Sequence, residues 1–148
     1  MSAFRIEPLS IDDYDALYAF WQATPGVGLS QADSREGIAC YLARNPGGSF
    51  QVRLDDLIVG SVLGGHDGRR GFLHHLAVAP ICRRQGVGRQ LVNAALAALR
   101  AEGIDKCHLM VFTHNESAQA FWRKLGWVVR EELRLVSCDL VPGTCSPC

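Results

Sequence analysis

Chemistry in this chain is first suggested by a segment rich in glycine and arginine, Arg83-Arg84-Gln85-Gly86-Val87-Gly88-Arg89. It stands between a strand-like run, residues 72–79, and an alanine- and leucine-rich helix pattern that begins near Gly88. Glycine lets the backbone turn tightly and approach a ligand closely. The N–H groups and the positive dipole end at the start of a helix attract anions. The sequence therefore predicts a site for a phosphate-bearing cofactor.

The elements that must hold this segment follow from hydrophobic periodicity. In chain order we expect a strand at 4–8, a helix that starts at 10–13 and runs to Trp21, a helix that ends at 45–48, strands at 50–54, 57–63 and 72–79, a helix that ends at Gly103, a strand at 106–112, a helix from 113–116 to Gly126, and strands at 127–130 and 133–140. The link from 72–79 to 106–112 has the length of a βαβ crossover, so these two strands should be parallel. We predict an α/β (α+β) fold: a mixed, mostly antiparallel sheet with one parallel crossover and about four flanking helices.

Composition narrows the class of protein. With 148 residues the chain is most simply one domain over residues 1–141, followed by a short tail at 142–148. Its 15 basic residues balance its 15 acidic residues, which argues against a nucleic-acid partner. The apolar stretches are strand-sized or broken by arginine, so we expect no membrane partner and a cytoplasmic location. Of the six cysteines, Cys145 and Cys148 are predicted to form an inert tail, and the others to be reduced thiols.

Two further segments decide what the glycine-rich segment resembles. A strand ends at residues 76–80 before it, and Asn115 precedes a second signature after it, Phe-Trp-Arg-Lys-Leu-Gly-Trp at residues 121–127. With Arg83-x-x-Gly86-x-Gly88 between them, this order resembles the GCN5-related N-acetyltransferase (GNAT) superfamily, whose acetyl-CoA motif is Q/R-x-x-G-x-G/A. The resemblance covers nearly the whole chain. A nucleotide P-loop fits less well, because the required lysine and hydroxyl residue are missing.

The resemblance implies acetyl-CoA as co-substrate. Backbone N–H groups from Arg84 to Arg89 would hold the pyrophosphate, the strand before them would pair with the pantetheine arm, and the acetyl carbonyl would sit near the N–H of Leu76. The cofactor-binding residues implied in this way are Leu76, Ala77, Val78, Arg84, Gln85, Gly86, Val87, Gly88, Arg89, Asn115 and Trp122. No metal is expected, because His66, His108 and His114 lack ligand spacing with other donors.

His74 is the candidate catalytic base for the implied reaction, the attack of an amine on a thioester. Residues 72, 74 and 76 should share one face of the strand, which in the family meets the substrate, whereas His75 should point to the opposite face. Imidazole, with an ordinary pKa near ~6.5, can accept a proton at neutral pH. A histidine satisfied within the sheet is an equally open interpretation.

Trp122 is where the chain departs from the family pattern. Many members have a tyrosine there that protonates the departing thiolate, and an indole N–H cannot act as this acid. A thiolate is a tolerable leaving group, since its thiol has a pKa near ~8.5, so water or another hydroxyl can serve. Asp67 and Glu7 are alternative bases, although both are better explained as charges of a turn or a sheet edge.

The acceptor is not encoded in a spacing pattern. The family builds its acceptor pocket around the segment between the first two helices, which implies substrate contacts for Trp21, Val27 and Leu29. We expect a small-molecule amine or a protein or peptide amino group, and the final strands at 127–140 are candidates for pairing in a homodimer. Two alternatives stay open: an acetyl-CoA-binding regulatory module with weak or no transferase activity, and a nucleotide-phosphate binder.

Overall fold

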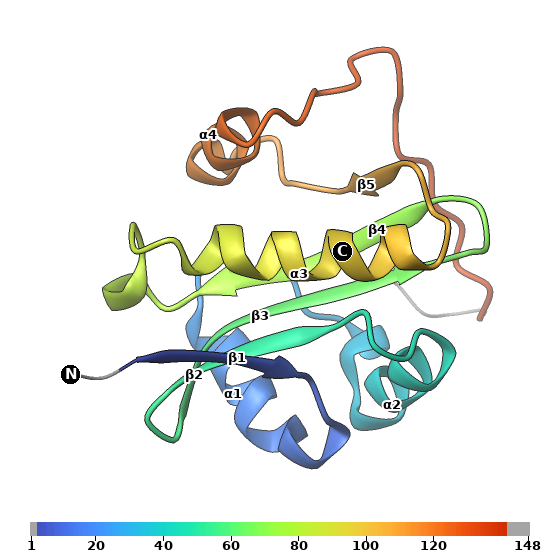
Figure 1. The fold of residues 1–148 in the computed structure, drawn as a ribbon. Helices are drawn as coiled ribbons and strands as arrows, with labels where there is room; N and C mark the ends of the chain where they lie inside the picture. The colour runs from blue at the N-terminus through green and yellow to red at the C-terminus, as the bar shows by residue number, and fades with distance from the viewer. Residues whose placement is uncertain (1–2, 142–148) are drawn as a thin grey trace. The chain divides into compact units, whose positions relative to one another are not determined.

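The computed structural model describes residues 3–141, so the predicted tail at 142–148 with Cys145 and Cys148 lies outside the described residues. The chain divides into two compact units between Met110 and Val111. The first unit contains β1 (Phe4–Pro8), η1 (Ile11–Asp13), α1 (Tyr14–Ala23), η2 (Gln31–Asp33), α2 (Arg35–Arg44), β2 (Phe50–Leu54), β3 (Leu57–His66), β4 (Gly71–Val78), η3 (Pro80–Cys82), α3 (Val87–Ala101) and β5 (Cys107–Leu109), where η denotes a short 3-10 helix (Figure 1). The second contains α4 (Glu116–Lys124). No helix among residues 3–141 is long and apolar enough to cross a bilayer.

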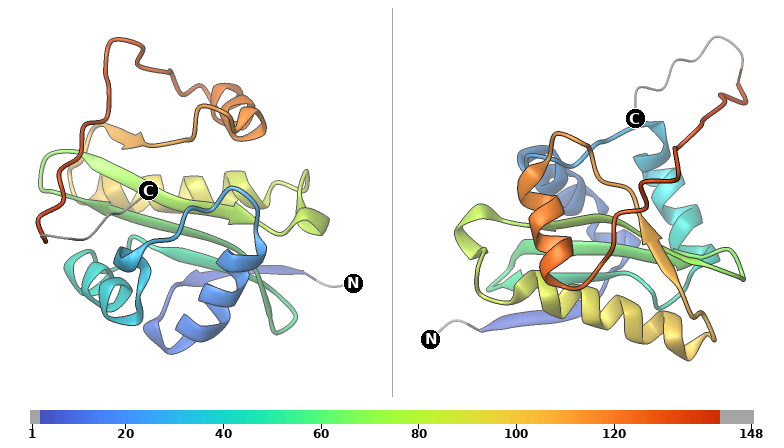
Figure 2. Two further views of the ribbon diagram at one scale, coloured as in Figure 1. Left: turned by 180° about the vertical axis from the view of Figure 1, so that it is seen from behind. Right: turned by 90° about the horizontal axis from the view of Figure 1, so that it is seen from above.

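The strands form one mixed sheet in the order β1-β2-β3-β4-β5. The first three neighbouring pairs are antiparallel, and β4 and β5 are parallel. The helix α3 makes the crossover between the two parallel strands. It covers one face of the sheet, and α1 and α2 cover the other (Figure 2). The predicted α/β (α+β) class, with a mostly antiparallel sheet and one parallel crossover, is confirmed.

The apolar stripe of α3 explains how this helix packs on the sheet. Its buried residues recur at helical spacing: Val87, Leu91, Val92, Ala95 and Leu99. A Cβ atom on Gly71 of β4 would lie only 2.8 Å from a methyl group of Leu99, closer than real side chains approach. The glycine therefore allows the helix to lie directly on β4.

The opposite face of the sheet carries the other part of the core. Leu17 and Trp21 of α1, Ile38 of α2 and Leu63 of β3 are each at most 3% exposed and pack as one cluster. Burying an aliphatic or aromatic side chain of this size contributes about 1.5–3 kcal/mol. This cluster holds α1, and the segment that follows it, against the sheet.

Of the three strands predicted near the C-terminus, the first is present but shorter, and the other two predictions were wrong. The strand expected at 106–112 is limited to Cys107–Leu109. Residues 127–130 and 133–140 form no strand in the described chain, and side chains such as Val136 are exposed, here by 89%. Alternating apolar residues become a strand only where a neighbouring strand supplies hydrogen bonds, which the pattern itself cannot reveal. The homodimer contact expected through these residues stays a prediction.

Candidate active site

A β-bulge interrupts β4. Between the cross-strand pairs Leu63–His74 and Ser61–Ala77, two residues of β4 face a single residue of β3. One of the two, His75, has a φ of 51°, in the left-handed region that histidine enters more readily than most residues. A bulge takes its extra residue out of the hydrogen-bond ladder and bends the strand. Backbone groups at this point of β4 therefore lie outside the regular ladder with β3.

His74 and His75 lie on the same face of the sheet as a result. The His74 ring is 6.1 Å from the Tyr41 ring of α2, and the His75 ring is 4.8 Å from the Trp21 ring of α1. Both helices cover this one face (Figure 2). The prediction that His75 points to the opposite face was wrong, because a left-handed residue breaks the alternation of side chains along a strand.

His74, the predicted base, is partly buried among aromatic rings. Its ring stacks on Phe72 with the centroids 6.5 Å apart and meets the Tyr41 ring edge-on. Burial lowers the pKa of His74, and the charge of the neighbouring His75 lowers it further, against a smaller opposing effect of Asp33. The imidazole is therefore neutral at neutral pH, which is the state that a proton acceptor needs.

The edge of β4 that faces β5 is open over most of its length. β5 pairs with β4 only at residues 71–73. From residue 74 to residue 78 this edge has no strand partner among residues 3–110, so its N–H and C=O groups, apart from the Val78 carbonyl that Arg83 contacts, can bind an extended ligand. Leu76, Ala77 and Val78, which we predicted to contact the pantetheine arm, lie on this stretch.

The start of α3 has the features of an anion site. Gly86 is its N-cap with a φ of 82°, and Arg84 also has a left-handed φ of 64°. No side chain among the described residues caps this helix, so the N–H groups of its first turn are left for a ligand. Arg84 and Arg89 are exposed, whereas Arg83 donates from Nε to the carbonyl of Val78 at 3.1 Å. Oriented amides and two exposed guanidinium groups suit a pyrophosphate.

The remaining residues of the predicted phosphate site differ in what they can offer. Val87 is 1% exposed and anchors the first turn of α3 in the core. The side chain of Gln85 donates to the carbonyl of Ile81 at 3.3 Å. Gly88 is partly exposed on the first turn. Val87 and Gly88 can therefore contribute only their backbone N–H groups.

The three predicted acceptor residues separate into two groups. Trp21 has no exposed surface and donates from Nε1 to Ser61 Oγ at 2.9 Å. Val27 and Leu29 are partly buried and pack against the core cluster. A fully buried side chain cannot contact an acceptor without moving. Trp21 instead supports the bulge, because Ser61, to which it donates, also donates to the carbonyl of His75. Only Val27 and Leu29 keep surface that an acceptor can contact.

In the second unit, Asn115 and Trp122 both contribute to local structure. Asn115 is the N-cap of α4, with Oδ1 accepting from the N–H of Ala118 at 3.2 Å. Trp122 is 9% exposed, and its ring lies 4.8 Å from the ring of Trp127. Their predicted contacts with acetyl-CoA stay predictions.

The two alternative bases are engaged in pairs of their own. Asp67 Oδ1 accepts from the N–H groups of Arg69 and Arg70 at 2.8 Å each, within a turn. Glu7 Oε1 accepts from Arg53 Nε at 2.6 Å, between the edge strand β1 and its neighbour β2. These contacts agree with the interpretation as turn and edge charges. Among residues 3–141, no three histidine, cysteine or acidic side chains gather as metal ligands.

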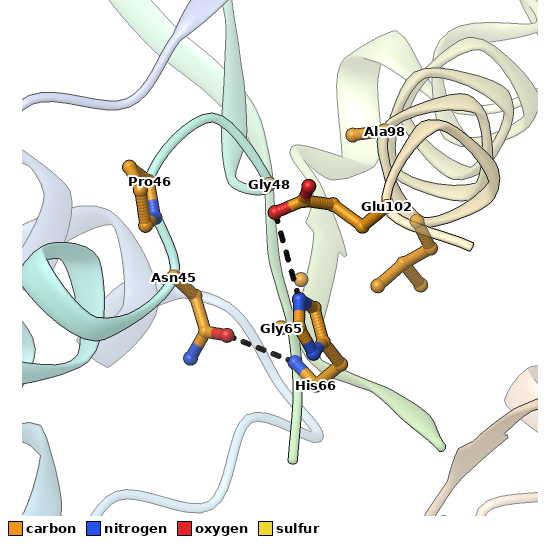
Figure 3. A pocket seen from close by; sticks show the side chains of 9 residues that line it. Asn45, Pro46, Gly48, Gly65, His66, Ala98 and Glu102 are labelled. Atoms are coloured by element: carbon orange, nitrogen blue, oxygen red, sulfur yellow. Dashed lines mark hydrogen bonds and ion pairs between the residues drawn. The ribbon is translucent and has the colours of Figure 1, made fainter. Parts of the chain in front are cut away.

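A small pocket lies between the end of α2, β3 and the end of α3 (Figure 3). There the N–H of His66 donates to Asn45 Oδ1 at 2.9 Å, and His66 Nε2 lies 3.7 Å from Glu102 Oε1. The pocket has a volume of about 20 Å³, which suits about one water molecule. It is therefore too small to hold acetyl-CoA.

Comparison with known proteins decides the family. The sequence profile of the Acetyltransferase (GNAT) family matches residues 14–127. The chain belongs to this family. An acetyltransferase of Pectobacterium atrosepticum is 32% identical to it over 114 residues, which are 77% of this chain and 80% of that protein.

Two solved structures with bound coenzyme A are similar to this GNAT chain. The PaiA N-acetyltransferase of Thermoplasma acidophilum in complex with coenzyme A has a TM-score of 0.73 and 20% identity, over 86% of this chain and 91% of that chain. An aminoglycoside N-acetyltransferase in complex with CoA has a TM-score of 0.75 and 17% identity, over 93% of this chain and 96% of that chain. At these identities the likeness shows the fold.

The predicted family and enzyme class are confirmed: the chain is a GNAT N-acetyltransferase that uses acetyl-CoA as donor. Because the family match continues past the boundary between the two units, one domain over residues 1–141 stays our prediction. Sequence reasoning missed the bulge and the contact of His75 with Asp33. The only feature of the sequence that could have indicated the bulge is the pair of consecutive histidines, His74 and His75, within a strand.

Proposed function

We propose that this GNAT chain transfers the acetyl group of acetyl-CoA to a primary amine of a small molecule or of a protein or peptide, by direct attack within a ternary complex. The observation that carries the proposal is the bulge in β4, which puts backbone outside the ladder next to the partly buried His74. The same strand leads into the uncapped start of α3. One continuous stretch, residues 74–89, thus supplies a base, a carbonyl site and a phosphate site.

On the donor side, the N–H groups from Arg84 to Arg89 hold the pyrophosphate, and the guanidinium groups of these two residues add positive charge. The pantetheine arm lies along the open edge of β4 at residues 76–78, as an added strand. The N–H of Leu76 donates to the acetyl carbonyl. That hydrogen bond strengthens as negative charge develops on the oxygen, and so lowers the barrier to attack.

On the acceptor side, His74 takes the proton that the amine must lose. An alkylamine has a pKa near ~10 and is mostly protonated at neutral pH, so a neutral imidazole is needed nearby. The amine nitrogen attacks the carbonyl carbon, a C–N bond forms and the C–S bond breaks. The sulfur leaves with the electron pair of the C–S bond and takes a proton from water, and the second proton that the nitrogen loses as the amide forms returns to that water.

The acceptor approaches on the face of the sheet that His74 shares with α1 and α2, where Val27 and Leu29 retain partly exposed apolar surface. These two side chains favour an acceptor with an apolar portion beside its amino group. One structural neighbour is an aminoglycoside N-acetyltransferase, so aminoglycosides belong in the first panel of acceptors.

The test is a CoA-release screen over polyamines, aminoglycosides, amino acids and peptides with free N-termini. For an active acceptor, initial rates are measured over a grid of acetyl-CoA and acceptor concentrations. Direct attack predicts intersecting lines in double-reciprocal plots, and His74→Ala should release CoA much more slowly at neutral pH. Parallel lines would instead indicate an acetylated enzyme and contradict the proposal.

One observation favours a second function. Trp122 stands where a tyrosine acts as the acid in many members, and it is buried among aromatic rings of its own unit. An acetyl-CoA-binding regulatory module would bind acetyl-CoA but acetylate no acceptor in the panel.

A nucleotide-phosphate binder, the other alternative left open by the sequence, would be stabilised against heat more by ATP than by CoA.

A further inference from the structure

A buried contact between Asp33 and His75 connects η2 to the bulge in β4. His75 Nε2 lies 2.7 Å from Asp33 Oδ1, and the two side chains are only 16% and 9% exposed. In the pair between Arg70 and Asp105, by comparison, the aspartate side chain is 84% exposed. Water and salt loosen an exposed pair, whereas a buried pair keeps one geometry and leaves an unpaired polar group when one partner is removed.

Asp33 also organises the segment in front of α2. Its Oδ2 accepts from the N–H of Ser30 at 3.0 Å, which forms a capping box with the side chain of Ser30, and its backbone carbonyl accepts from the hydroxyl of Tyr14 at 2.6 Å. The segment 24–30, which carries Val27 and Leu29, ends at this box. Asp33 therefore holds the C-terminal end of this segment.

His75, the partner of Asp33 in β4, is itself held in place by the core. The carbonyl of His75 accepts from Ser61 Oγ at 3.2 Å, and Ser61 Oγ accepts from Trp21 Nε1 at 2.9 Å. The His75 ring also lies edge-on against the Trp21 ring. Trp21 and Ser61 are both 0% exposed. Backbone and ring of His75 are thus tied to the core, so the pair gives Asp33 a fixed point on the sheet.

We infer that the Asp33–His75 pair is a positioning element that holds the segment 24–33 against the bulge and thereby sets the affinity for the acceptor amine. The inference rests on the proposed function, because the acceptor is expected on this face beside His74. His75 acts through Asp33 and touches neither acceptor nor donor. Loosening the pair moves Val27 and Leu29 away from the place where the amine must meet the carbonyl.

The variants separate the pair from its surroundings. Asp33→Ala removes both carboxylate contacts, whereas Asp33→Asn keeps an acceptor for the N–H of Ser30 and a group that can hydrogen bond to His75. Asp105→Asn removes the exposed pair and is the matched control. If Asp33→Ala does not fold, His75→Asn takes its place, since asparagine tolerates a left-handed backbone but does not reproduce the imidazole contact.

We expect Asp33→Ala to raise the KM for the acceptor about tenfold, the effect of one ordinary interaction, with kcat and acetyl-CoA affinity little changed. Hydrogen–deuterium exchange should accelerate in peptides that cover residues 24–33. Asp33→Asn should restore the acceptor KM to within about threefold of wild type, which corresponds to about half of that interaction. Asp105→Asn should match wild type in both measurements.

Two results would overturn the inference. One is unchanged exchange over residues 24–33 in Asp33→Ala, which can be measured whether or not an acceptor is known. The other is a fall in kcat at constant acceptor KM, which would assign the pair to the chemical step. Failure of the wild type to acetylate any amine contradicts the proposed function instead, and is distinguished by normal exchange and normal acetyl-CoA binding in the same sample.

Discussion

His74 and His75 are consecutive in the sequence, yet both project toward the helices on one face of the sheet. The His74 ring meets Tyr41 of α2, and the His75 ring meets Trp21 of α1. The left-handed backbone of His75 is the cause. The bulge therefore places a partly buried, neutral imidazole directly beside one that is engaged by Asp33. His74 can therefore serve as the proposed base while His75 holds Asp33.

Replacement of His74 should change the pH dependence of acetyl transfer. Burial, assisted by the charge of His75, holds the pKa of His74 below its ordinary 6.5, so wild type should remain active into mildly acidic solution. A general base contributes roughly 100-fold or more, so His74→Ala should be slower by about that factor near neutral pH. Above about pH 10 the amine loses its own proton and the variant should approach wild type. The measurement is kcat/KM for the acceptor as a function of pH, and an unchanged profile removes His74 from the mechanism.

Gly86 and Gly103 form a matched pair at opposite ends of α3. They have nearly equal φ values, 82° and 81°, and a Cβ atom on either would meet no other atom within 4 Å. Valine at either position should cost about 1–2 kcal/mol of folding free energy, because it must adopt a left-handed backbone. Only Gly86→Val should also weaken acetyl-CoA binding, by about tenfold or more, through obstruction of the pyrophosphate.

Calorimetric titration with acetyl-CoA compares the two glycine variants, and urea unfolding checks that both are folded. Equal acetyl-CoA affinity for Gly86→Val and Gly103→Val would exclude the start of α3 as the phosphate site.

Asp33 should contribute to the acid sensitivity of the fold. Burial alone raises the pKa of the Asp33 carboxyl, but the hydrogen bond and charge of His75 and the N–H of Ser30 outweigh it, so the pKa lies below its ordinary 3.8. A carboxyl with a depressed pKa stabilises the fold above the unfolded-state pKa, and this contribution disappears as the pH falls through the folded-state value.

Below about pH 5, wild type should therefore lose more unfolding free energy than Asp33→Asn does. Urea unfolding of the two proteins at several acidic pH values measures the difference. Parallel curves for wild type and variant would contradict a charged Asp33 in the folded protein.

Trp122→Tyr tests whether an acid is missing from the site. A thiol pKa near ~8.5 makes the thiolate an adequate leaving group, so we expect turnover to change by no more than about twofold when the tyrosine is introduced. Thermal unfolding reports separately on the loss of packing against Trp127. A rise in kcat of tenfold or more would favour the weakly active regulatory module.

The parts of the site that depend on local sequence were predictable. The start of α3 is set by Gly86 and by the apolar stripe that follows it, and both are visible in the residues. The strand before it was predicted to within one residue of Gly71–Val78. The pattern and the turn chemistry agree at these positions, so sequence reasoning located the strand and the start of α3, where the phosphate site is proposed.

The bulge and the final segment could not be found in the same way. His75 is fixed by contacts from Trp21 and Ser61, which are distant in sequence, and no local pattern requires a left-handed histidine. Residues 127–140 have the alternation of a strand, yet in the described chain they form none. In both cases the structure depends on partners from elsewhere in the chain, which periodicity does not encode.

The most direct test of acetyl transfer by this GNAT chain uses acetyl-CoA labelled with carbon-13 in the acetyl group. After incubation with the acceptor panel, mass spectrometry follows the label. The proposed direct attack predicts the label in an amide on an acceptor amine, none on the protein, and far less product with His74→Ala at neutral pH. Label retained on the protein, or bound acetyl-CoA without labelled product from any amine, would contradict it.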